Sequence, residues 1–589
     1  MEGGPALPAA SRRQALLLGA VLLITFLAYS GTMRFQFVYD DGAQIVYNPA
    51  VQSWKLVGRM FSEHVWSGQV GATPNFYRPV FLLWCLLNFT AFGLKAAWWH
   101  LTTVGLHLVA TALVYRLARR LGGDDFVAAL AALIFGLHPI HVESVAWISG
   151  VTDPLMAVFV LGSFLTYLAY RERRRWTALA TSLVLYGLAC LSKEPGIVLV
   201  ALIAGHEWIA AAAGTKLRAR IRGLMIPLAP YAAVAALYLA QRHAVLKAFG
   251  HAVVALPWYA VPLTWPELLW FYARKLVWPA GLSPFYDTPY VTRADVEHFW
   301  TPLAAVLAVA VLVWLCVRRL GGEAAPGERR SPRQMAWIAL LWIMVPLLPV
   351  LDILSLEPHE MAHDRYLYLP CAGFAMLVAM AVRRLQMGEA RVFGQPMARM
   401  AVVILLLALL GTGTAAQSVY WANDLLLYYR AVSIAPSSLS ASRSLANALL
   451  QRGYYAEGIK IHEGLLRRDP NYWASYYSLG DAYYKQGRLP EAAAYMLRAA
   501  QLNPSHPQIF LYLGLLQLKL QQLPQAEGNV RTAIRMWPNT TGGNYVLGLV
   551  LEEEGKWSEA AEAFRRELAL NADQPKVREE LEKAEQHLK

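Results

Sequence analysis

The sequence predicts an all-α membrane protein, in which a bundle of about eleven membrane-spanning helices is followed by a C-terminal solenoid of helical repeats. Three observations lead to this fold class. Of the 589 residues, 57% are hydrophobic and only 16% are charged, a balance that a soluble globular chain of this length does not normally reach. Hydrophobic stretches of membrane-spanning length recur as far as residue 418. Beyond that residue, a 34-residue period follows.

Eleven hydrophobic stretches in residues 1–418, which we take as the membrane domain, are long enough to cross a bilayer. The first has no convincing small-residue cleavage site after it, so we expect it to remain as the first span. The stretches lie near 14–32, 97–116, 125–140, 152–170, 177–192, 196–212, 223–240, 299–317, 335–351, 366–382 and 400–418.

Basic residues indicate how these spans are oriented. Clusters such as Arg12-Arg13, Arg171 to Arg175 and Arg383-Arg384 each follow an even number of predicted crossings. Because cytoplasmic loops collect Lys and Arg, we expect the N-terminus in the cytoplasm and, after eleven crossings, the C-terminus outside it. In a bacterium this membrane would be the inner membrane. Of the net charge of +13, all but one unit lies in the first 419 residues, which favours an orientation signal and disfavours a nucleic-acid partner.

Two further apolar segments would break this alternation if they crossed the membrane. Residues 77–93 lie in the first outer loop, 33–96, and residues 265–278 are rich in aromatic residues and flanked by Pro266 and Pro279. We therefore predict that both form helices at the membrane interface. Together they would cover a cavity on the outer side.

The repeats are defined by small residues and prolines spaced 34 residues apart. This is the tetratricopeptide spacing, in which small residues let two antiparallel helices pack closely. The prediction is a domain at 419–589 with repeats near 439–472, 473–506, 507–540 and 541–574 and a capping helix at 575–589. The evenly spaced residues are Pro436, Pro470, Pro504 and Pro538; Gly480, Gly514 and Gly548; and Ala492, Ala526 and Ala560.

The same spacing predicts a half repeat with a helix at 424–434, which would stack the last span onto the array. Tetratricopeptide arrays bind extended segments in a concave groove, and six tyrosines are candidates to line it for an acceptor or a partner. The alternative is that most of them pack between helices. They are Tyr454, Tyr455, Tyr476, Tyr477, Tyr483 and Tyr484.

Several polar clusters fall on the predicted outer side. Asp40 and Asp41 lie just past the first span, where a charged pair is costly unless it is solvated, paired or used. An ordinary solvated Asp-Asp-Gly turn is the alternative. The other clusters, which suggest a polar cavity for a charged head group, are His138, His141, Glu143 and Asp153; Lys193 and Glu194; and Asp364 and Arg365.

Two of these clusters have plainer explanations, and the segment just before Asp364 resembles a metal-binding pattern. His359 and His363 with Glu360 resemble the HExxH pattern of zinc peptidases, but that pattern needs a regular helix, and Pro358 in a short loop argues against one. His138 and His141 could bind a metal, or simply form a turn at the interface. Lys193 and Glu194 could form a simple ion pair.

In these residues the chain resembles the transmembrane and tetratricopeptide-repeat O-mannosyltransferase-like proteins of the GT-C glycosyltransferase superfamily. The chain departs from the family pattern at Asp364, where the family usually has Glu. It also has a reduced outer segment near 284–296 and a short repeat array. The matching pieces occur in family order and are Tyr39-Asp40-Asp41 with Asn48-Pro49; Tyr77-Arg78-Pro79; His138-Pro139 with His141, Glu143, Trp147, Gly150 and Asp153; Ser192-Lys193-Glu194; and Asp364-Arg365-Tyr366-Leu367-Tyr368-Leu369-Pro370.

The resemblance implies transfer of a sugar, mannose by analogy, from a polyprenyl phosphate to a hydroxyl of a protein or glycan on the outer side. Such transfer needs a carboxylate for the acceptor and cations for the departing phosphate. We expect Asp41 as the catalytic carboxylate, because Gly42 would leave it open to the cavity, with Asp40 in support. The cation would be Arg365, followed by Lys193 and Arg78.

Alternatives remain at this stage. Arg365 could instead form a salt bridge with Asp364 or Glu360. No cofactor is certain, and a divalent metal near His138, His141 and Glu143 is possible. The whole protein could be a catalytically silent scaffold for envelope assembly, or a transporter or polymerase of lipid-linked glycans. The polar residues gathered on one side favour the enzyme over the scaffold, and the aspartate of the outer loop favours it over the transporter.

Overall fold

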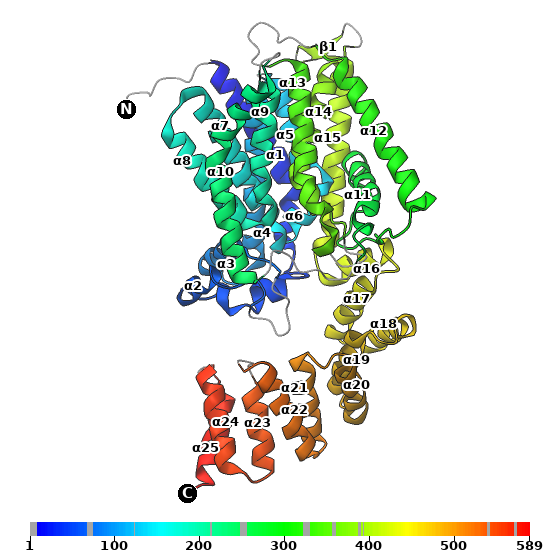
Figure 1. The fold of residues 1–589 in the computed structure, drawn as a ribbon. Helices are drawn as coiled ribbons and strands as arrows, with labels where there is room; N and C mark the ends of the chain where they lie inside the picture. Colours follow the sequence, from blue (N-terminus) through cyan, green and yellow to red (C-terminus); the bar gives the residue numbers. More distant parts are fainter. Residues whose placement is uncertain are drawn as a thin grey trace, which may run out of the picture. The chain divides into compact units, whose positions relative to one another are not determined.

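The computed structural model describes residues 9–67, 75–122, 124–211, 215–247, 256–321, 330–355, 361–386, 390–392, 394–538, 542–570 and 574–589, and these are mostly helical (Figure 1). The chain forms two compact units. One ends at Ala435 and the other begins at Pro436. The division therefore lies beyond the predicted boundary at 418, so that the helix expected at 424–434 belongs to the membrane unit.

Helices lie at all eleven predicted spans. Within the described residues, eight are long and apolar enough to cross a membrane, and there are nine if the pair α5 and α6, bent by 49°, counts as one span. The helices at the predicted positions, with α6 following α5, are α1 (Ala9–Tyr29), α4 (Ala96–Gly122), α5 (Asp125–Leu137), α6 (Val142–Ala146), α7 (Thr152–Arg173), α8 (Trp176–Ser192), α9 (Leu199–Ala210), α10 (Leu217–Leu246), α12 (Thr301–Arg318), α13 (Pro332–Met344), α14 (Tyr368–Arg383) and α15 (Met397–Ser418).

The count differs from eleven because α8 and α9 have only 17 and 12 residues. The sequence Lys193-Glu194-Pro195-Gly196 separates them. Proline removes a backbone donor and restricts the residue before it, so a short 3₁₀ turn at Glu194–Val198 replaces the first turn of the expected span. Two polar side chains consequently lie at a helix break.

The unit also contains helices outside the predicted spans and a small hairpin. The predicted interfacial segments are helices α3 (Pro79–Phe92) and α11 (Ala260–Val277), accompanied by α2 (Val57–Met60). Helix α16 (Asp424–Ile434) has the predicted bounds, and Asn423 caps it by accepting a hydrogen bond from the backbone N–H of Leu426. A two-residue antiparallel hairpin, β1 (Arg391–Val392) with β2 (Gln395–Pro396), completes the unit.

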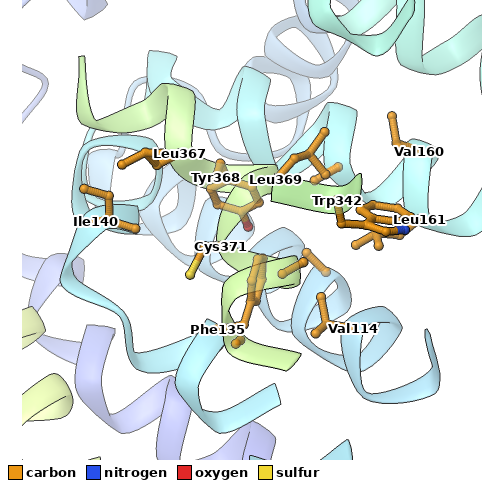
Figure 2. Close-up of a cluster of buried hydrophobic side chains, with 14 of the residues drawn as sticks. Val114, Phe135, Ile140, Val160, Leu161, Trp342, Leu367, Tyr368, Leu369 and Cys371 are labelled. Carbon is orange, nitrogen blue, oxygen red and sulfur yellow. The ribbon is translucent and has the colours of Figure 1, made fainter. Parts of the chain in front are cut away.

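The core of the membrane unit joins helices that are distant in sequence. Figure 2 shows Phe135 of α5, Val114 of α4 and Tyr368 of α14 packed together, with Trp342 of α13 beside Leu161 of α7. Helices α13 and α14 approach so closely at Gly373 that a Cβ there would overlap the carbonyl oxygen of Ala339. This packing fixes the ends of α5, α7 and α14, which carry the polar residues discussed below.

The second unit follows the predicted repeats. Each helix packs on its sequence neighbours, and a Cβ at Gly480 would lie 2.8 Å from Cγ of Met496, which explains the small residues at the predicted spacing. The helices are α17 (Leu439–Gln451), α18 (Tyr455–Arg468), α19 (Trp473–Lys485), α20 (Leu489–Leu502), α21 (Pro507–Lys519), α22 (Leu523–Met536), α23 (Gly543–Glu553), α24 (Trp557–Leu570) and α25 (Pro575–Gln586).

The candidate groove tyrosines divide between two environments. Tyr483 is buried, and Tyr476, Tyr477 and Tyr484 pack against the same apolar cluster. Tyr454 is 52% exposed. Four of the six therefore contribute to packing between helices, and the ligand-binding groove stays a prediction.

Candidate functional site

Asp41 anchors the loop that follows α1. Its carboxylate accepts hydrogen bonds from the backbone N–H of Val38 (3.0 Å) and, on the other oxygen, from the N–H (2.8 Å) and hydroxyl (2.6 Å) of Ser149. The side chain is completely buried. Burial raises the pKa of Asp41 to about 7, against the lowering effect of these hydrogen bonds. The expectation that Gly42 leaves Asp41 open is therefore wrong, because both oxygens face donors within the protein.

Asp40 is the more accessible of the two acids. It is partly exposed, and it follows Tyr39, whose φ of 58° lies in the left-handed region. A bulky residue in that conformation is strained, and such strain persists only where surrounding contacts hold it. Here the N–H of Tyr39 donates to Asp424 (2.9 Å), and its ring contacts Trp147 edge-on with ring centroids 5.2 Å apart. The backbone at the aspartate pair is thus fixed in an uncommon shape.

The three predicted cations each pair with a carboxylate from another segment. Arg78, just before α3, donates to Glu194 through Nη2 (2.7 Å) and Nε (3.0 Å). Lys193 donates to Asp153 of α7 over 2.6 Å, and both side chains are almost fully buried. The suggested Lys193–Glu194 ion pair is therefore wrong, because the two neighbours point to different partners.

The charges of these residues influence one another. The pKa of Lys193 is lowered to about 8, mainly by burial; Asp153 opposes this shift, and Arg365 and Arg78 contribute to it. Burial raises the pKa of Glu194, but Arg78 outweighs it and the net shift is downward. Three cations are thus held close together at one end of the bundle, each beside its own carboxylate.

Arg365 binds Glu143, a partner not among those considered from the sequence. Its guanidinium pairs with one carboxylate oxygen of Glu143, and its backbone N–H donates to the other over 3.0 Å. The side chain of Glu143 is 2% exposed and that of Arg365 is 18% exposed. Asp364 does not pair with Arg365, since it accepts hydrogen bonds from the hydroxyl of Tyr286 (2.6 Å) and the N–H of Ser283 (3.2 Å). Glu360 lies outside the described residues.

Two aromatic residues connect these groups. The guanidinium of Arg365 lies 5.6 Å from the ring of Trp147 and 5.4 Å from that of Tyr366. The Lys193 ammonium also lies 5.6 Å from the ring of Tyr366. Because Trp147 also contacts Tyr39, a continuous set of contacts runs from the aspartate pair to the cations.

The described histidines of this region make contacts within the protein. One ring nitrogen of His138 accepts from the N–H of Ile140 (3.2 Å), and the other lies 3.0 Å from the carbonyl oxygen of Leu276. Its two nitrogens are thus occupied, as in the turn interpretation. His141 is buried against Phe135 and Tyr368. Among the described residues, no three His, Cys, Asp or Glu side chains are grouped so that they could hold a metal ion. His359 of the HExxH pattern falls outside those residues.

Sequence reasoning missed four residues of this site. Tyr366 lies within the motif that begins at Asp364, and Ser149 directly precedes Gly150 of another motif. Their positions in these motifs could have indicated that they belong to the site. Tyr286 and Asp424 carry no local signal, because only the fold brings them to Asp364 and Tyr39.

Comparison with known proteins agrees with both units. The family model for dolichyl-phosphate-mannose-protein mannosyltransferase matches residues 77–240, and the tetratricopeptide-repeat model matches 443–507 and 511–575. The matched membrane segment contains Arg78, Glu143, Asp153 and Lys193.

Comparison with curated proteins finds named relatives over most of this chain. Protein O-mannosyl-transferase F38B6.6 of Caenorhabditis elegans is 24% identical over 78% of this chain and 63% of its own length. TMTC3 of Mus musculus is 23% identical over 94% of this chain and 64% of its own, and Tmtc1 of Drosophila melanogaster is 24% identical over 94% and 83%.

The predicted resemblance to the transmembrane and tetratricopeptide-repeat O-mannosyltransferase-like family is confirmed. The chain spans slightly less than two thirds of the length of the first two relatives. The matched family and the apolar helices together identify an integral membrane protein.

Proposed function

We propose that the protein is a membrane glycosyltransferase that moves a sugar, mannose by analogy with the named relatives, from a polyprenyl phosphate to a hydroxyl group. The acceptor is a protein or glycan on the extracytoplasmic side, and the repeats bind the acceptor or a partner. The observation that carries the proposal is the contact path from the Asp40-Asp41 pair through Trp147 to Arg365, Tyr366 and Lys193.

Asp40 and Asp41 have different roles in this proposal. Asp40 is partly exposed and orients or deprotonates the acceptor hydroxyl, as a positioned general base does. Asp41 is committed to Ser149 and Val38 and holds the loop in place. This assignment reverses the order of preference from the sequence, because a carboxylate with both oxygens already hydrogen-bonded and no exposure cannot reach an acceptor.

The cations stabilise the leaving phosphate. Charge-assisted hydrogen bonds from Arg and Lys to phosphate oxygens are strong, and fixed donors act best in a site from which water is excluded. Arg365 is the first choice, since its side chain is the more exposed partner of its pair. Lys193 and Arg78 supply further positive charge from the helix break and from the start of α3.

The scaffold hypothesis has one specific observation in its favour. Arg365, Lys193 and Arg78 each already pair with a carboxylate, as purely structural ions would. The two hypotheses are separated by an isosteric change at Asp40. Only an enzyme would lose sugar transfer through this change.

The deciding experiment is Asp40→Asn in purified full-length protein supplied with polyprenyl-phosphate mannose. Turnover should fall by a factor on the order of 10² to 10⁴, the usual contribution of a positioned base, while donor binding and the apparent melting temperature stay close to those of the wild type. Asp125→Asn, at the start of α5 where Asp125 pairs with Arg119, is the matched control and should retain turnover. Wild-type activity that survives Asp40→Asn would remove the proposed role of this residue.

A further inference from the structure

The segment between the last spanning helix and the repeats packs against residues next to the site. Gln417 of α15 and Arg430 of α16 both donate to the carbonyl oxygen of Leu282, over 2.9 and 3.2 Å. Trp421 stacks on Trp147 with ring centroids 6.0 Å apart. Residues 417–430, which we name the closing segment, therefore contact two parts of the membrane unit that lie far from them in the sequence.

The closing segment also binds the first outer loop directly. The N–H of Gln36 donates to the carbonyl oxygen of Ala422 over 3.1 Å. Three residues later, the N–H of Tyr39 donates to the carboxylate of Asp424 over 2.9 Å. The ring of Tyr39 contacts Tyr428 edge-on. Two backbone hydrogen bonds and an aromatic contact thus fix the loop immediately before Asp40.

The bond to Asp424 acts at the strained point of this loop. Tyr39 has a φ of 58°, a conformation that costs a non-glycine residue free energy and reverts unless neighbouring contacts hold it. A carboxylate that accepts a backbone N–H makes a strong hydrogen bond. After Asp40 in the chain, the carboxylate of Asp41 accepts hydrogen bonds from the backbone N–H groups of Val38 and Ser149. Asp40 is held between these two anchors.

We propose that Asp424 is a positioning residue for the transfer reaction, one that holds Asp40 in its working orientation through the backbone of Tyr39. The proposal rests on the function proposed above. It assigns a catalytic task to the first residue of α16, which the sequence suggests only as part of a half repeat.

The test compares three variants of the full-length protein. Asp424→Ala removes the acceptor of the Tyr39 N–H. Asp424→Asn keeps an oxygen in the same place. Asn423→Ala is the matched control, since Asn423 caps the same helix through the N–H of Leu426 but is not the residue that binds the outer loop.

Two measurements separate positioning from folding. With polyprenyl-phosphate mannose as donor, Asp424→Ala should lower kcat about ten- to a hundredfold, the effect of losing one charge-assisted hydrogen bond, with less than a twofold change in KM for the donor. Hydrogen exchange in a peptide covering residues 36–46 should accelerate in the same variant. Asp424→Asn should keep most of the wild-type kcat and most of the protection from exchange, and Asn423→Ala should resemble the wild type in both measurements.

Two outcomes would overturn the proposal. Equal losses of kcat in Asp424→Ala and Asn423→Ala would assign the effect to the stability of α16. Unchanged exchange at residues 36–46 in Asp424→Ala would show that the bond does not hold the loop. If the wild type transfers no sugar from any donor, the proposed function fails, whereas the exchange measurement still decides whether Asp424 fixes the loop.

Discussion

Replacing Arg365 tests whether its guanidinium binds the donor or only neutralises Glu143. Glu143 is nearly fully buried and accepts two hydrogen bonds from Arg365. Removal of one partner of a buried ion pair typically costs about 3–5 kcal/mol, because the other charge is left unpaired. Arg365→Met retains the backbone N–H bond to Glu143, so we expect the lower end, about 3 kcal/mol, measured by chemical or thermal unfolding in detergent.

The double variant Arg365→Met with Glu143→Gln separates the two roles. It removes both charges and leaves an amide oxygen for the backbone N–H, so most of the lost stability should return. Affinity for radiolabelled polyprenyl-phosphate mannose should remain about ten- to a hundredfold lower, as expected for a lost charge-assisted hydrogen bond of about 1.5–3 kcal/mol. Arg171→Met, which breaks the pair with Glu207 at the other end of α7, is the control and should leave donor affinity unchanged. Recovery of donor affinity together with stability would refute a phosphate-binding role.

Three further predictions concern the pH dependence, the packing and the orientation. Because burial raises the pKa of Asp41 to about 7, folding should weaken as pH rises from about 4 to 8, by as much as about 4 kcal/mol, and Asp41→Asn should abolish this slope in melting curves. Gly150→Ala places a Cβ 2.6 Å from the carbonyl oxygen of Glu143 and should lower both melting temperature and transfer, whereas Gly105→Ala, with open space around it, should lower neither. A reporter that functions only in the cytoplasm should be silent after Lys589, and a signal there would contradict the proposed orientation.

Local patterns predicted most of the helices and the repeats. The 34-residue period placed α17 to α25 because each repeat forms from contacts between neighbours in the sequence. Hydrophobic length placed the spanning helices, but it also counted α8 and α9 as spans, although these helices have only 17 and 12 residues. The period also predicted α16, although it could not show that this helix belongs to the membrane unit.

Local sequence patterns could not predict which residues the charged side chains pair with. Lys193 and Glu194 are adjacent, yet they pair with Asp153 and Arg78, which are 40 and 116 residues away. Proximity in the sequence instead favoured a pair between the two neighbours. The same difficulty applies to Asp41, whose burial depends on Ser149. A motif can therefore identify the residues of such a site while the fold alone assigns their roles.

The hydrogen bond between Tyr39 and Asp424 joins residues 385 positions apart, and this separation has a consequence during synthesis. Ribosomes add about 5–20 residues per second, so Tyr39 emerges roughly 20–80 seconds before its partner exists. Through that interval the first outer loop has its neighbouring spans but lacks the bond that holds its strained residue. The hydrogen bond beside the aspartate pair can form only when α16 emerges, after every spanning helix has been made. A chain that stops short of α16 cannot form this bond, so the proposed transfer activity would reach its full level only once the membrane unit is whole.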